Sequence, residues 1–129
     1  MTAEEKNPWA EIIGPCYTTA SLARALRWTE TEVFGAAAAL EVLEVETVEG
    51  TRLYPAFQVR DGRVIEGLHL VLRELGIGTA SRWTWAQWLN SPYDDDSGEP
   101  APTAIEQLLA GQLDDVLRDA RHAAASWSQ

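Results

Sequence analysis

Few side chains in this sequence are suited to acid–base or nucleophilic chemistry. Cys16, His69 and His122 are the conventional candidates besides hydroxyls and carboxylates. Both histidines fall in helix-like stretches, one rich in leucine and one in arginine and alanine, where a structural or surface histidine is more common than a catalyst. The sequence has no glycine-rich phosphate loop, no metal-ligand cluster and no nucleophile elbow. We therefore expect a protein that is not an enzyme and that needs no cofactor or metal.

An acidic run, Asp94 to Gly98, invites comparison with a calcium-binding loop. An EF-hand loop that begins at Asp94 places Gly98 at a ligand position and Ile105 where a bidentate glutamate belongs. The register therefore favours a solvated acidic loop.

Composition sets the class of protein. The chain has 129 residues, of which 46% are hydrophobic and 23% charged, so it is long enough for one domain with its own core. Ten Lys and Arg against twenty Asp and Glu give a formal net charge of −10. This charge repels phosphate backbones and suits a basic partner. The polar, acidic N-terminus, the single cysteine and the lack of a long apolar run predict a soluble, cytoplasmic protein.

The first part of the chain has the spacing of a helix-turn-helix. We divide the sequence into an N-terminal arm over 1–16, a helix-turn-helix-like region over 17–48 and a remaining region over 49–129. Thr18 or Thr19 can cap the first helix, and Thr29 or Thr31 can cap the second. The glycine expected in the turn is replaced by Arg27, so the turn is made in another way.

The rest of the chain predicts a mainly α fold with a small antiparallel β element between residues 42 and 65. Alternation over 42–48 and an extended run over 52–59 predict two strands, and Asp61-Gly62 predicts a hairpin turn. A helix is expected from Glu66 to Leu75, ended by Gly76 and Gly78. Three further helices follow, after Ser81, after the capping residue Thr103 and over 113–127.

Six tryptophans are many for this length. Trp85 and Trp88 lie on one face of a predicted helix, whereas Trp83 points elsewhere. We expect two of these three in the core and at least one partly exposed, as anchors of interfaces often are. Trp127 either closes the core or contacts a partner.

The charge of the second predicted helix opposes DNA binding by this helix pair. The stretch from Thr29 to Glu44 carries four glutamates and no Lys or Arg, so a groove-facing second helix is repelled by phosphate. Arg24 and Arg27 are the candidate DNA contacts that remain. An alternative hypothesis is nevertheless a helix-turn-helix transcriptional regulator that binds DNA as a dimer or with a partner. Clustering of Arg24, Arg27 and Arg52 on one face would favour it.

Several short sequence strings and single residues occur in a particular order along the chain. They are the run Leu53 to Gln58 (LYPAFQ), the Asp61-Gly62 turn, Gly67-Leu68, Trp83, Ala86, Trp88-Leu89, Gly98, Glu106, Leu108, Gly111, Val116 and Ala120. In this order and spacing they resemble the Xre/MbcA/ParS-type antitoxins with their toxin-binding domain. The match spans about residues 14–125. One departure is Ala104, which stands where the family often has proline.

This resemblance implies an antitoxin of a type II toxin–antitoxin system. Its expected partner is a RES-type, NAD-degrading toxin, which it neutralises by direct binding at the active-site cleft. Contact with operator DNA is expected to be weak or to depend on the complex, and formation of a homo-oligomer is left open. We expect the toxin to contact Trp83 and the last helix, at Leu113, Val116, Leu117, Arg118, Arg121 and Trp127.

Overall fold

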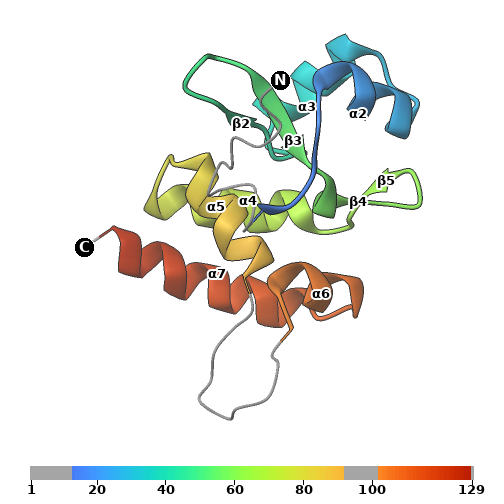
Figure 1. Ribbon diagram of the computed structural model, residues 1–129. Coiled ribbons are helices and arrows are strands. Elements are labelled where there is room, and N and C mark those ends of the chain that lie inside the picture. The colour runs from blue at the N-terminus through green and yellow to red at the C-terminus, as the bar shows by residue number, and fades with distance from the viewer. Residues whose placement is uncertain (1–12, 92–101, 129) are drawn as a thin grey trace.

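The computed structural model describes residues 13–91 and 102–128. The fold is mainly α with a small antiparallel β element, as the sequence predicts. A helix pair and a three-stranded sheet form the N-terminal part, and four helices form the C-terminal part (Figure 1). Each part has its own apolar cluster, and Val64 of the connecting hairpin packs against both.

The predicted helix pair consists of α2 (Thr19–Leu26) and α3 (Glu30–Ala38). Thr18 and Thr29 cap the two helices, each in a reciprocal capping box that satisfies two orphan N–H groups. Leu22 and Val33 are fully buried where the helices meet. Arg27 itself makes the turn, because it adopts the left-handed conformation (φ 62°) in which glycine is usually found.

A three-stranded antiparallel sheet completes the N-terminal part. Its strands are β1 (Cys16–Tyr17), β2 (Val45–Glu46) and β3 (Arg52–Pro55), in the order β1-β3-β2. Strands β2 and β3 form a hairpin that follows the helix pair in the sequence. The predicted boundary between residues 48 and 49 falls inside the hairpin, since Thr47 accepts from Gly50 and pairs with Thr51.

The predicted strands are longer than the observed ones. The strand expected over 42–48 is reduced to β2, and the run expected over 52–59 stops at Pro55. A 3-10 turn, η1 (Ala56–Gln58), follows, because the Gln58 side chain is drawn into the interior. There its amide accepts from Leu43 N (2.7 Å) and donates to Leu43 O (2.9 Å) and Pro55 O (3.0 Å). The side chain thereby replaces strand pairing.

A short hairpin joins the two parts. It consists of β4 (Val59–Arg60) and β5 (Arg63–Val64), and Asp61-Gly62 makes the predicted turn with positive φ at both residues. The hairpin lies against α2: a Cβ atom on Gly62 would be 3.5 Å from the Ala25 carbonyl oxygen.

The C-terminal part is built on two long helices that lie side by side, α4 (Leu68–Gly78) and α7 (Leu113–Trp127) (Figure 1). The shorter α5 (Arg82–Asn90) and α6 (Ala104–Leu109) pack on each other, and α6 packs on α7. The core between these helices is aliphatic with one tryptophan; its fully buried members include Leu68, Val71, Leu72, Leu75, Trp85, Leu89, Val116 and Ala120.

The helix α4 runs three residues beyond the predicted end at Leu75. Gly76 lies inside α4, and Gly78 is its last residue. A Cβ atom on Gly78 would lie 2.5 Å from the Ala124 Cα atom of α7, and one on Gly76 would lie 3.3 Å from the Trp85 ring. Gly78 thus serves close helix–helix approach, which propensity rules cannot detect from the chain alone.

Candidate protein-binding site

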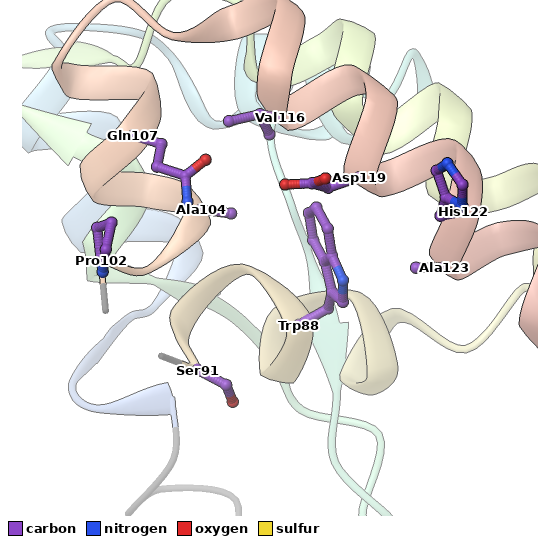
Figure 2. A pocket seen from close by; sticks show the side chains of 9 residues that line it. All are labelled: Trp88, Ser91, Pro102, Ala104, Gln107, Val116, Asp119, His122 and Ala123. Carbon is purple, nitrogen blue, oxygen red and sulfur yellow. The ribbon is translucent and has the colours of Figure 1, made fainter. Parts of the chain in front are cut away.

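A pocket of about 550 Å³ opens between α5, α6 and α7 (Figure 2). Its size lies within the range of ligand pockets in proteins. Its walls come from α5, α6, α7 and the chain beside them: Trp88, Ser91, Pro102, Ala104, Gln107, Val116, Asp119, His122 and Ala123. The pocket is therefore a feature of the packed helices and not of one sequence motif.

The three clustered tryptophans have three different environments. Trp85 is 3% exposed, and its Nε1 donates to Thr79 O (3.0 Å). Trp83 is half-buried and donates from Nε1 to Glu46 O (2.9 Å), so it ties α5 to β2. Trp88 is also half-buried, and its ring stands in the pocket. Trp83 does point away from the other two, but Trp85 alone of the three is fully buried.

The apolar residues predicted as toxin contacts on α7 are largely used within the fold. Val116 is 1% exposed, and Leu113, Leu117 and Trp127 are partly buried against the same core. The apolar stripe of α7 faces α4, which is the ordinary use of such a stripe. Val116 still forms part of the pocket wall. Trp127 ends α7 and helps to close the core.

Both arginines predicted as toxin contacts lie on the outer side of α7. Arg118 pairs with Asp115 (2.8 Å), and Arg121 lies 3.5 Å from Glu74 of α4. The arginine side chain of each pair is exposed to solvent, so each ion pair stabilises the fold only weakly. A partner carboxylate could replace either intramolecular carboxylate at little cost.

Sequence reasoning missed Trp88, Asp119 and His122 as a group. They come from α5 and α7, which are separated in the sequence by residues 91–112, and only the helix packing brings them together. One signal was present: once Trp85 and Leu89 are assigned to the core, Trp88 must lie toward the edge of that face.

Two of the arginines considered for DNA binding belong to the end of α2. Arg24 lies in its last turn, next to Ala25, whose carbonyl oxygen faces the β4–β5 turn at Gly62, and Arg27 is the C-cap residue. Arg52 lies 5.1 Å from the centre of the Phe34 ring of α3 and 3.9 Å from Glu44. The exposed side of α3 itself presents Glu30, Glu32 and Phe34.

The described side chains with a shifted pKa, Cys16 and Tyr54, owe the shift to burial within the fold. Burial raises the pKa of the Cys16 thiol, which keeps it protonated. Burial also raises the pKa of Tyr54 to about 12, and the hydrogen bond that its hydroxyl donates to Glu44 (2.7 Å) acts in the same direction. His69 and His122 are exposed. Across residues 13–91 and 102–128, no group of three His, Cys, Asp or Glu side chains could hold a metal ion. The acidic run at Asp94 lies outside the described residues.

None of the described helices is long and apolar enough to cross a membrane.

Comparison with known proteins informs the fold. No family model matches the chain, and no curated protein matches it. An NMR structure of Rv2175c superposes on it with a TM-score of 0.71 and 22% sequence identity, over 85% of this chain and 81% of that one. The two proteins share a fold; identity this low carries no function from one to the other.

Proposed function

We propose that this protein is the antitoxin of a type II toxin–antitoxin system and that it neutralises a RES-type, NAD-degrading toxin by direct binding at the active-site cleft. The observation that carries the proposal is the open pocket between α5, α6 and α7, with the Trp88 ring standing in it. A half-buried tryptophan at the edge of a cavity is typical of an interface anchor. The resemblance of the LYPAFQ string and the helices after it to antitoxins supplies the class of partner.

Charge supports the same proposal. A cleft that binds the pyrophosphate of a dinucleotide is expected to be basic, and a partner of net charge −10 is drawn toward it. Occlusion needs no chemistry from the antitoxin. The proposal therefore assigns no catalytic residue, cofactor or metal to this chain.

Co-expression with the product of the neighbouring gene tests the proposal. We expect that product to stop growth and deplete NAD when expressed alone, and both effects to disappear when this protein is present. Truncation at Gly111 is unsuitable, because it removes Val116, Ala120 and Ala124 from the core. Trp88→Ala is the better variant, with Gln87→Ala on the exposed side of α5 as its control. A harmless neighbour, or one that stays toxic beside the wild-type chain, contradicts the proposal.

A second candidate function is sequence-dependent DNA binding as a helix-turn-helix regulator. The β2–β3 hairpin after α3 favours it, because this arrangement is common among DNA-binding domains. The acidic exposed side of α3 opposes it. Anisotropy of a labelled operator duplex at low salt separates the candidates. If DNA is the target, the isolated chain binds the duplex tightly, and the double variant Arg24→Gln, Arg27→Gln weakens this binding about tenfold.

A further inference from the structure

Among the described residues, the wall of the pocket between α5, α6 and α7 contains one carboxylate side chain. This is Asp119 of α7, which is exposed. Gln107 of α6 adds an amide, and His122 of α7 adds an imidazole. Among the described residues that line the pocket there is no Lys or Arg. The electrostatic character of the wall therefore suits a cation and opposes an anion such as a phosphate.

Asp119 differs from the carboxylates near it. Asp115, one turn earlier on α7, is neutralised by Arg118, and Glu74 of α4 is neutralised by Arg121. Within residues 13–91 and 102–128, Asp119 makes no ion pair and no hydrogen bond through its side chain. Its charge is available to a group that enters the pocket.

The Trp88 ring supplies the second half of a cation site. It stands up from α5 toward α7, and its tip points to the Asp119 side chain (Figure 2). The face of an indole ring attracts cations through its quadrupole, and tryptophan does so best among the aromatic residues. A planar guanidinium can stack on such a ring while its N–H groups reach a carboxylate.

We propose that this pocket binds an arginine side chain of the protein partner, with the guanidinium stacked on Trp88 and paired with Asp119. Gln107 lines the same pocket and offers an amide oxygen as a further hydrogen-bond acceptor. The inference rests on the proposed function in one respect, since it names the chemistry by which the partner is held. A basic toxin surface would supply such a side chain.

Small-molecule probes test the pocket without the toxin. Nα-acetyl-arginine amide, titrated into the ¹⁵N-labelled full-length chain, is expected to shift the indole N–H resonance of Trp88, assigned by its loss in Trp88→Phe. The citrulline analogue has nearly the same shape without the charge, and it should leave the resonance in place. Equal shifts from the two compounds, or shifts only at other residues, would overturn the proposal.

Asp119→Asn is the decisive variant, and Asp114→Asn is its control on the same helix, outside the pocket. Both remove one negative charge from an exposed position. We expect Asp119→Asn to weaken arginine amide binding about fivefold and Asp114→Asn to leave it unchanged. Unchanged binding in Asp119→Asn would refute the proposal. Neutralisation of a toxin without arginine binding here would refute the pocket assignment alone. Arginine binding without any toxin complex would refute the antitoxin function alone.

Discussion

Gln58 is a fully buried polar side chain whose three hydrogen bonds hold η1 against the segment at Leu43. Gln58→Leu keeps the volume but leaves a buried N–H and two carbonyl groups without partners. Because each unsatisfied buried group costs on the order of 1–3 kcal/mol, we expect a loss of about 3 kcal/mol in the free energy of unfolding. Urea denaturation measures it. Gln87→Leu, at an exposed position of α5, should change stability by less than about 0.5 kcal/mol. Equal losses in the two variants would contradict this account.

Tyr54 predicts a pH dependence at the alkaline end. Its pKa is about 12 in the folded chain, and a tyrosine in the unfolded chain has a pKa of about 10. Folding thus favours the protonated hydroxyl, so its contribution to stability is complete below pH 10 and is lost as the pH rises toward 12. Thermal unfolding from pH 9 to 12 should show a steeper fall for the wild type than for Tyr54→Phe. Parallel pH profiles would contradict the assignment.

Helix caps and tight turns were the features that the sequence predicted best. Thr18, Thr29 and Thr103 cap helices as predicted, because a cap depends only on a few neighbouring residues. The Asp61-Gly62 turn is equally local. The conformation of Arg27 could not be assigned, since a non-glycine residue takes a positive φ only when the surrounding structure requires it.

At the scale of elements, the contact between α4 and α7 organises the C-terminal part. Gly78 of α4 approaches the backbone of α7 at Ala124 so closely that a methyl group does not fit. We expect Gly78→Ala to lower the free energy of unfolding by about 2 kcal/mol, because a helix must shift to admit it. The matched control is Gly35→Ala in α3, where a Cβ atom meets nothing within 4 Å. There helix propensity should raise stability by up to about 1 kcal/mol. A stabilising Gly78→Ala would show that the helices do not approach as described.

The elements also explain what the sequence could not reveal about the site. The period of α7 correctly indicated an apolar stripe, but a stripe that packs on α4 and one that binds a partner have the same spacing. The pocket at Trp88 arises only when α5, α6 and α7 meet, and no local pattern specifies that meeting. The strand lengths were overestimated because the buried side chain of Gln58 competes with strand pairing.

At the level of the whole molecule, the net charge of −10 should act mainly on the rate of association with a charged partner. If the partner presents a basic cleft, the association rate should fall about tenfold or more between low salt and 0.5 M salt, while the dissociation rate changes less. Stopped-flow mixing with the purified toxin measures both rates. An association rate independent of salt would show that charge does not guide the encounter.

The central claim is that this molecule acts by placing the pocket-bearing face of α5, α6 and α7 on a toxic enzyme. Its most direct test is the activity of the purified neighbouring gene product on NAD, measured with increasing amounts of wild-type chain, Trp88→Ala or Gln87→Ala. The account predicts stoichiometric inhibition by the wild type and by Gln87→Ala, and inhibition at least about tenfold weaker by a folded Trp88→Ala. Full inhibition by Trp88→Ala, or none by the wild type, would contradict it.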